Sequence, residues 1–217
     1  MDIGIVGSGA VGRTLGAGFV ARGHRVMIGS REPGRQELLD WRAENGPDAL
    51  LGSNLEAARF GQLLVFAIKW SGARNAFELA GGAQYFAEKV VIDTSNPIGQ
   101  DSAGKMMLVV EPDTSAAEQI QSWMPDAKLV KAFSWVGYRS MVDPCFSEGP
   151  ASGFLCGDDA DAKAIVANIL REFGWDPIDM GALSAARALE PLVLLWMAYG
   201  RTHGTWDHAV RLVRWEP

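Results

Sequence analysis

One glycine-rich turn constrains the fold of this chain more than any other part of its sequence. Residues 3–6 form a short apolar run, which predicts a buried strand. The run leads directly into Gly7-Ser8-Gly9-Ala10-Val11-Gly12, a turn with GxGxxG spacing, and an apolar stripe at helical spacing continues from there to Phe19. A strand, this turn and a helix in that order predict the first βα unit of a dinucleotide-binding domain.

Each glycine of the turn has a separate steric role in such a unit. Gly7 permits the tight turn, Gly9 lets a pyrophosphate approach the main chain, and Gly12 lets the helix pack closely against the strand. The first N–H groups of the helix and the positive end of its dipole would then face the anion. The residues predicted to bind the pyrophosphate are Gly7, Ser8, Gly9, Ala10, Val11 and Gly12.

The end of the second expected strand, residues 25–28, indicates which dinucleotide binds. NAD-binding domains usually place Asp or Glu there, where the carboxylate bonds the ribose 2′-hydroxyl. This chain has Ser30 and Arg31, and a hydroxyl beside a guanidinium suits the 2′-phosphate of NADP(H). Arg35 supplies a second cation nearby. The adjacent Glu32 leaves NAD open as the alternative, because a shift of one residue would put its carboxylate at the ribose.

Strand and helix patterns alternate through the first two thirds of the chain. Apolar runs that predict further strands occupy residues 49–51, 63–68, 90–92 and 129–132. Helical patterns lie between them, at residues 36–44, 73–79 and 116–123. This alternation predicts an α/β protein with an NAD(P)-binding Rossmann fold, in which helices cover both faces of a doubly wound, mostly parallel sheet.

A second, smaller part is expected after residue 145. Pro, Gly, Ser and Cys replace the regular pattern between residues 143 and 153. The predicted domains are a dinucleotide-binding domain at 1–145 and a small C-terminal α/β or helical subdomain at 146–217. Its expected elements are a strand at 151–156 and amphipathic helices at 162–173 and 192–199. The last helix is strongly apolar, so we expect it to pack on the first domain or against a second copy of the chain.

Ligands of doubly wound sheets bind beyond the carboxyl ends of the strands. The candidates there for the rest of the cofactor are Ala67, Ile68, Lys69, Asn96, Pro97, Ala132, Phe133 and Ser134. Trp70 and Trp135 follow two of these strand ends, and each is expected either to flank a flat ligand or to pack in the core. No catalytic acid or base is predicted, because hydride transfer between two rings depends on holding the reactive carbons together and away from water.

Composition and charge argue against several other classes of protein. The net charge is −6 over 217 residues, which argues against binding of nucleic acid. Cys145 and Cys156 form no CxxC pair and no cluster with His, so we expect two reduced thiols and no metal site. The apolar run at 192–199 is far shorter than the ~20 residues of a membrane-spanning helix, and no signal peptide is recognised. These features predict a soluble cytoplasmic protein with no membrane partner.

Several segments together resemble the F420-dependent NADP oxidoreductase family, small Rossmann proteins related to the reductase domain of the STEAP metalloreductases. The segments are GIVGSGAVGRTLGAGFVARGHRVMIGSRE from residue 4, VVIDTSNPI from residue 90 and LVKAFSWVG from residue 129. The C-terminal segments FLCGDDADAK, FGWDPIDMG and AARALEPLVLLW also resemble bacterial members. The resemblance covers nearly the whole chain, in order.

The resemblance implies reversible hydride transfer between NADP(H) and a planar acceptor, either the deazaflavin coenzyme F420 or a flavin, in a homodimer. It implies that Asn96 and Pro97 lie near the ribose and nicotinamide, and that residues 132–134 lie beside the nicotinamide. Two departures concern the acceptor end: Lys69-Trp70 stands where many relatives have Pro, and Ser134 where relatives often have Asn. The alternatives are an NADPH-dependent reductase of a small carbonyl or imine, and an NADPH-sensing module without turnover.

Overall fold

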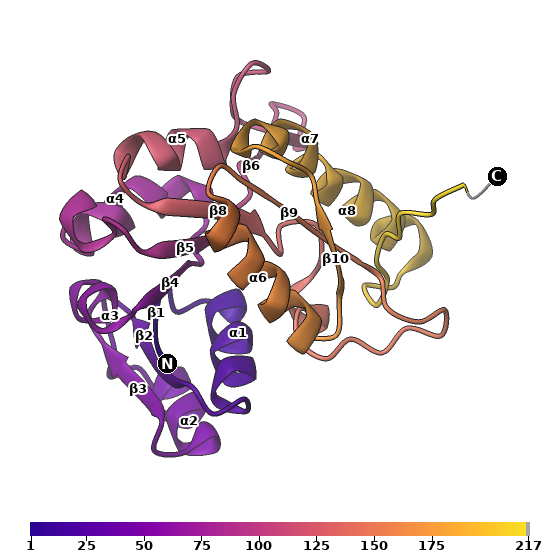
Figure 1. Cartoon of the computed structure of the whole chain (residues 1–217). Helices are drawn as coiled ribbons and strands as arrows, with labels where there is room; N and C mark the ends of the chain where they lie inside the picture. Colours follow the sequence, from indigo (N-terminus) through magenta and orange to yellow (C-terminus); the bar gives the residue numbers. More distant parts are fainter. Residues whose placement is uncertain (216–217) are drawn as a thin grey trace.

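One eight-stranded sheet forms the centre of the computed structural model, which describes residues 1–215 (Figure 1). The strand order is β10-β9-β8-β5-β4-β1-β2-β3, and every neighbouring pair is parallel except β8 with β9. The chain runs outward from β1 in both directions, so the predicted doubly wound, mostly parallel α/β sheet is confirmed. The strands are β1 (Asp2–Val6), β2 (Arg25–Gly29), β3 (Ala49–Gly52), β4 (Leu63–Phe66), β5 (Val90–Asp93), β8 (Lys128–Ala132), β9 (Ser152–Gly157) and β10 (Asp176–Asp179).

Helices cover both faces of this sheet. Successive residues of β1 point to opposite faces, so contacts at Gly4 and Ile5 show which helix lies on each face. A Cβ on Gly4 would lie 2.0 Å from the carbonyl oxygen of Ala57, so α3 packs directly on that face. On the other face, a Cβ on Gly16 of α1 would lie 3.3 Å from Ile5 Cδ1. The helices are α1 (Ala10–Val20), α2 (Gln36–Asn45), α3 (Asn54–Phe60), α4 (Ala73–Leu79), α5 (Ala116–Trp123), α6 (Ala160–Glu172), α7 (Ala186–Leu189) and α8 (Leu192–His203).

Strand β4 is buried along its whole length, as expected for a central strand covered on both faces. It ends at Phe66 rather than at the predicted residue 68. The Ala67 N–H still donates to the Val6 carbonyl at 2.9 Å, but the chain then turns into the short helix Trp70–Gly72. The earlier end places Ala67 and the two residues after it beyond the carboxyl edge of the sheet.

Three features were not expected from the sequence pattern. Helix α3 has only seven residues, and its start is stabilised by reciprocal bonds between Ser53 and Glu56, a capping box. Strand β10 contains Pro177, which is tolerated because β10 lies at the edge of the sheet. The third feature is a separate antiparallel hairpin of two three-residue strands, β6 (Ile98–Gln100) and β7 (Met106–Leu108).

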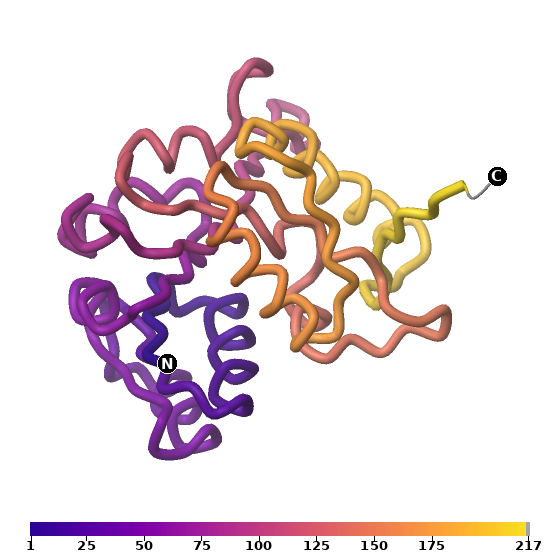
Figure 2. The backbone as a smooth tube through the Cα atoms, viewed as in Figure 1, coloured from indigo at the N-terminus to yellow at the C-terminus, as the bar shows by residue number. Residues whose placement is uncertain are grey.

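The chain after residue 145 extends the same sheet. Strand β9 pairs antiparallel with β8, and β10 pairs parallel with β9. After α8 the chain returns to the start of β9, where the Ser152 N–H donates to the Val210 carbonyl at 3.1 Å (Figure 2). The division into domains at 1–145 and 146–217 stays a prediction, and residues 216–217 lie outside the described residues. No helix within residues 1–215 is both long and apolar enough to cross a membrane.

Candidate functional site

The glycine turn joins β1 to α1, and two of its glycines are required by the fold itself. Gly7 has φ +121°, and a Cβ there would lie 2.3 Å from the carbonyl oxygen of Ala67. A Cβ on Gly12 would lie 2.1 Å from the carbonyl oxygen of Gly7. Gly9 differs, because its φ of −74° suits any residue and a Cβ there would meet nothing within 4 Å. The fold therefore does not require a glycine at residue 9, and the space beside it is open.

This open space lies at the N-terminus of α1, a helix of eleven residues. Gly9 is the N-cap residue, so no side chain caps the first N–H groups, and no acidic residue stands in the first turn. These N–H groups and the positive end of the helix dipole are thus free to bind an anion.

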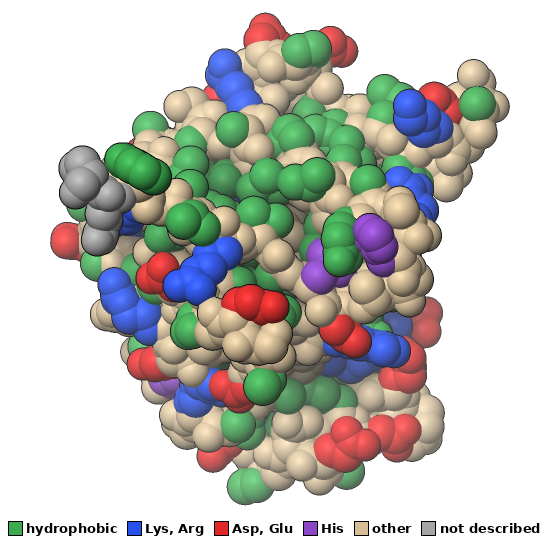
Figure 3. Space-filling view, turned by 90° about the vertical axis from the view of Figure 1, so that its right-hand side faces the viewer, with side chains coloured by type: hydrophobic (Ala, Val, Ile, Leu, Met, Phe, Trp, Pro, Cys, Tyr) green, Lys and Arg blue, Asp and Glu red, His purple; other side chains and the backbone are tan. Residues whose placement is uncertain are grey.

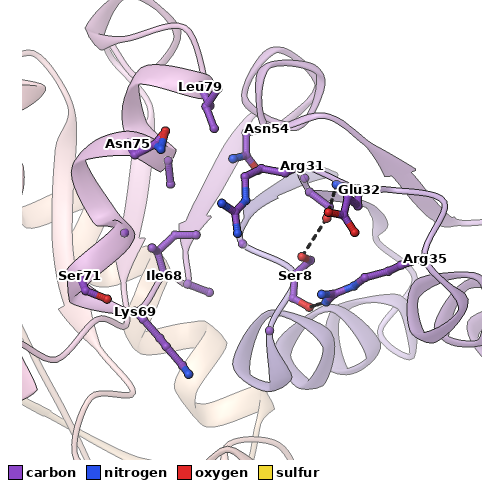
Figure 4. A pocket seen from close by; sticks show the side chains of 17 residues that line it. Ser8, Arg31, Glu32, Arg35, Asn54, Ile68, Lys69, Ser71, Asn75 and Leu79 are labelled. Atoms are coloured by element: carbon purple, nitrogen blue, oxygen red, sulfur yellow. Dashed lines mark hydrogen bonds between the residues drawn. The ribbon is translucent and has the colours of Figure 1, made fainter.

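A cavity of about 510 Å³ opens beside the turn, at the carboxyl ends of β1, β2 and β4 (Figure 4). The predicted cofactor residues that line it are Gly7, Ser8, Gly9, Ser30, Arg31, Arg35, Ala67, Ile68 and Lys69. They come from three strand ends, and the parallel sheet brings these ends to one edge. Ala10, Val11 and Gly12 belong to α1 and do not line the cavity, so their contact with a cofactor stays a prediction.

Polar contacts hold the turn after β2 against the glycine turn. The Ser8 hydroxyl donates to the Ser30 hydroxyl at 3.1 Å, and Ser30 Oγ also accepts from the Glu32 N–H at 3.1 Å. Arg35 donates to the Ser8 carbonyl (Figure 4). Because Ser30 Oγ accepts both of its hydrogen bonds, its own proton remains free to be donated to a ligand.

Arg31 differs from the two other arginines near the turn. Arg13 and Arg35 lie 3.4 and 3.6 Å from the carboxylate of Glu37. Arg31 is exposed and lines the cavity, into which its guanidinium points, and no residue of the described chain forms an ion pair with it (Figure 4). Glu32 lines the same cavity. An anion bound there would meet the Arg31 guanidinium and the Ser30 hydroxyl together.

The other wall of the cavity comes from α3, α4 and the turn before α4, and the sequence did not predict it. Its residues are Asn54, Ser71, Gly72, Asn75, Ala76 and Leu79. Asn54 is only 6% exposed, and its Oδ1 atom has no hydrogen-bond partner among the described residues. This oxygen packs against the end of β2, where a Cβ added to Gly29 would lie 2.8 Å from it. The Ser53–Glu56 capping box could have indicated this wall in the sequence, whereas no motif marks the α4 residues.

The remaining predicted cofactor residues form a second group, at the ends of β5 and β8. They are Asn96, Pro97, Ala132, Phe133 and Ser134, and none of them lines the cavity beside the glycine turn. Asn96 Nδ2 donates to the Ser134 carbonyl at 2.6 Å, so the structure brings the two strand ends together. Residues 132–134 are fully buried. The role of this group in cofactor binding stays a prediction.

The two tryptophans at the strand ends do not flank a common space. Trp135 is fully buried and stacks on Phe133, with ring centroids 6.3 Å apart and planes 9° apart. Trp70 stacks on Trp123, with centroids 5.8 Å apart. Of the two roles open to Trp135, packing in the core is therefore the one it has here, because no surface of its ring is left for a ligand.

The cysteines differ in their surroundings. Cys156 is buried, and burial raises the pKa of its thiol to about 12, so it stays protonated and unreactive. Cys145 is exposed. Within residues 1–215 no group of three or more His, Cys, Asp and Glu side chains is placed to hold a metal ion.

A family model and two proteins of similar length that match this chain are described as F420-dependent NADP oxidoreductases or reductases. The family model described as NADP oxidoreductase, coenzyme F420-dependent, matches residues 2–97. The crystal structure of a provisionally named F420-dependent NADP reductase from Arthrobacter sp. FB24 is 34% identical, with a TM-score of 0.92 over 99% of this chain and 100% of that one. An F420-dependent NADP reductase from Methanocaldococcus jannaschii is 24% identical over 208 residues, 91% of each chain.

Larger relatives are found among the metalloreductases. Metalloreductase STEAP3 of Rattus norvegicus is 28% identical over 205 residues. The match covers 88% of this chain but 36% of that protein, so the chain spans about a third of the length of the curated metalloreductases it matches. The similarity to these proteins therefore concerns one part of each of them.

Proposed function

The chain belongs to the F420-dependent NADP oxidoreductase family, and from this premise we propose that it transfers hydride between NADP(H) and a planar acceptor. The acceptor in this proposal is coenzyme F420 or a flavin. The nicotinamide ring of NADPH supplies the hydride when the cofactor is bound. The observation that carries the proposal is that the open N-terminus of α1 and the Ser30–Arg31 pair face one cavity.

The residues around the cavity fit the phosphate groups of NADP(H). The uncapped N–H groups of α1 suit the pyrophosphate, and Gly9 leaves room for it. Arg31 and the free proton of Ser30 suit the 2′-phosphate, since a guanidinium offers a planar fork of donors. Arg31 has no ion pair to break within the described chain, so binding a phosphate there replaces only water.

The second group of residues supports the placement of the nicotinamide. In the proposal, the cofactor extends from the cavity toward Asn96, Pro97 and residues 132–134, and the planar acceptor lies beside the nicotinamide. Asn96, which is partly exposed, orients the ring in this proposal, and the fully buried residues 132–134 support the wall behind it and exclude water. No proton donor is assigned, because hydride transfer needs the two reactive carbons at about 3–3.5 Å rather than an acid or a base.

Turnover with a panel of acceptors tests the proposal. The protein is mixed with NADPH and, one at a time, with F420, FMN, FAD, a quinone and a small cyclic imine, while the absorbance of the reduced nicotinamide is followed. We expect oxidation of NADPH with F420 or a flavin. Oxidation with the imine alone would support the carbonyl or imine reductase alternative. Binding of NADPH without turnover across the panel would support the sensing module.

Replacing Gly9 by alanine is expected to weaken NADP⁺ binding at least tenfold, about 1.4 kcal/mol, while the protein remains folded. The added methyl group meets no atom of the protein, and the φ of Gly9 suits alanine, so the free energy of unfolding should stay equal or rise by about 0.4–1 kcal/mol. The methyl group would, however, occupy the space where the pyrophosphate approaches the main chain. Calorimetric titration and urea unfolding measure the two effects.

Gly12→Ala is the matched control for this substitution in the same turn. Its Cβ would lie 2.1 Å from the Gly7 carbonyl oxygen, so it should lower the free energy of unfolding by about 1–3 kcal/mol. If Gly9→Ala bound NADP⁺ as tightly as the original chain, the pyrophosphate would not lie over Gly9.

We further propose that the protein is a homodimer and that it is cytoplasmic. Large apolar side chains gather on the face that carries α8 and the segment after it (Figure 3). Among them, Leu195 is 58% exposed and Tyr199 48% exposed, four residues apart on α8. An apolar face of this kind is typical of a protein–protein interface. The two cysteines without a disulfide support the cytoplasmic location.

A further inference from the structure

A buried network of charged side chains lies directly behind the strand ends of the second group. Lys131 Nζ on β8 is 2.8 Å from Asp93 Oδ2 on β5 and 3.0 Å from Glu190 Oε1, between α7 and α8. It also donates to the main-chain carbonyl of Ser95. None of the three charged side chains is more than 1% exposed. An ammonium has three N–H donors, so each donor of Lys131 has an acceptor.

The oxygens of both carboxylates have partners as well. Asp93 Oδ1 accepts from the Ser95 N–H at 2.9 Å. Glu190 accepts from the N–H groups of Ala116 and Ala117, at 2.9 and 3.0 Å, in the first turn of α5. Burial opposes the charge of Lys131, but the facing carboxylates outweigh it and raise the pKa of Lys131, so the ammonium stays charged. The network thus joins β5, β8, α5 and the junction of α7 with α8 (Figure 1).

The network fixes the turn that carries Asn96. Lys131 holds the Ser95 carbonyl, and the next residue, Asn96, bonds the Ser134 carbonyl through its Nδ2. Asn96 Oδ1, Ser95 Oγ and Ser134 Oγ are buried and have no hydrogen-bond partner within the described chain. Phe133 has φ +60°, a conformation that a residue with a side chain adopts only under constraint. Two adjacent strand ends are therefore held in one arrangement, and within the described chain they contain buried polar atoms without a hydrogen-bond partner.

We infer that Lys131 and Glu190 are positioning residues for the nicotinamide half of the cofactor. Lys131 holds the turn at Ser95 and Asn96, and Glu190 connects it to α5 and to the C-terminal helices. Desolvating two carboxylates and one ammonium is unfavourable, and well-packed apolar side chains of similar volume are often at least as stabilising in such a space. Their presence at this edge therefore points to orientation of the turn. The inference rests on the proposed function, since it assumes that NADP(H) binds across this edge of the sheet.

The test compares two ligands by calorimetry in Glu190→Gln. NADPH carries the nicotinamide, whereas adenosine 2′,5′-bisphosphate carries both adenosine phosphates and no nicotinamide. A glutamine would present its NH₂ group to either the ammonium or the α5 N–H groups, donor against donor, and so release the turn. We expect the Kd of NADPH to rise about tenfold or more and that of the bisphosphate to change less than about twofold. The fluorescence of the bound reduced nicotinamide should shift toward that of free NADPH.

Two further variants keep the test decisive. Asp93→Asn disturbs the network from the opposite side. It should also weaken binding of NADPH and leave binding of the bisphosphate unchanged, so it provides the test if Glu190→Gln does not fold. Lys128→Met, on the same strand but 39% exposed, is the control and should leave both affinities unchanged.

The outcomes separate the inference from the proposed function. Equal weakening of both ligands in a folded variant, or no change in either, would mean that the network has only a structural role, and would overturn the inference. If the original chain bound neither NADPH nor the bisphosphate, the proposed function would itself be wrong.

Discussion

Replacing Lys131 by methionine is expected to lower the free energy of unfolding by about 3–5 kcal/mol. Methionine has a similar length and fills the same space, so the packing of β8 changes little. The substitution removes the ammonium from between Asp93 and Glu190 and leaves two carboxylates facing each other in a space closed to water. An uncompensated buried charge is among the few mechanisms that destabilise a protein this strongly. Urea unfolding followed by circular dichroism measures the change.

Lys128→Met controls for loss of a lysine from the same strand. Lys128 is 39% exposed and reaches Glu88 and Asp159 only at 3.9 and 4.0 Å, so its loss should change the free energy of unfolding by less than about 1 kcal/mol. Similar effects from the two substitutions would mean that the buried pairing of Lys131 does not stabilise the fold.

Replacing Arg31 by alanine is expected to weaken NADPH binding by about 1.5–3 kcal/mol, between roughly tenfold and 150-fold. The guanidinium points into the cavity and, within residues 1–215, has no other ion-pair partner, so the 2′-phosphate would be its main contact. NADH lacks that phosphate, and its affinity should barely change. Calorimetric titration of the variant with both dinucleotides measures the difference.

Arg25→Ala is the matched control, because Arg25 begins the same strand at the opposite edge of the sheet and pairs with Asp2 there. It should leave the affinities for both dinucleotides unchanged. Equal losses of affinity for NADPH and NADH in Arg31→Ala would show that Arg31 does not bind the 2′-phosphate. Glu32 would then be the residue to substitute.

The sequence predicts the part of the candidate site that depends on short-range spacing. The GxGxxG turn is complete within six residues, and its steric demands at Gly7 and Gly12 follow from its position between a strand and a helix. Ser30, Arg31 and Ala67 were placed by a general rule about the carboxyl ends of parallel strands, and all three line the cavity. No pairing of distant residues had to be known for either prediction.

The parts that were missed depend on contacts between distant segments. Asn54 lines the cavity because α3 packs under the glycine of β2, and the short helix leaves too weak a periodic signal to be expected. The strand predicted at 129–132 contains Lys131, and nothing in the local sequence names a partner for its charge. Only the pairing of β8 with β5 puts it opposite Asp93. Trp135 likewise needs the positions of Phe154 and Trp175 before its burial can be known.

In the proposed site, the start of α1 and Arg31 bind two phosphate groups of the same ligand. Binding of the two nicotinamide dinucleotides to the unaltered chain tests this most directly. We expect calorimetric titration to give saturable binding of NADPH, and binding of NADH that is weaker by at least about tenfold. No heat with either dinucleotide, or equal affinity for both, would contradict it.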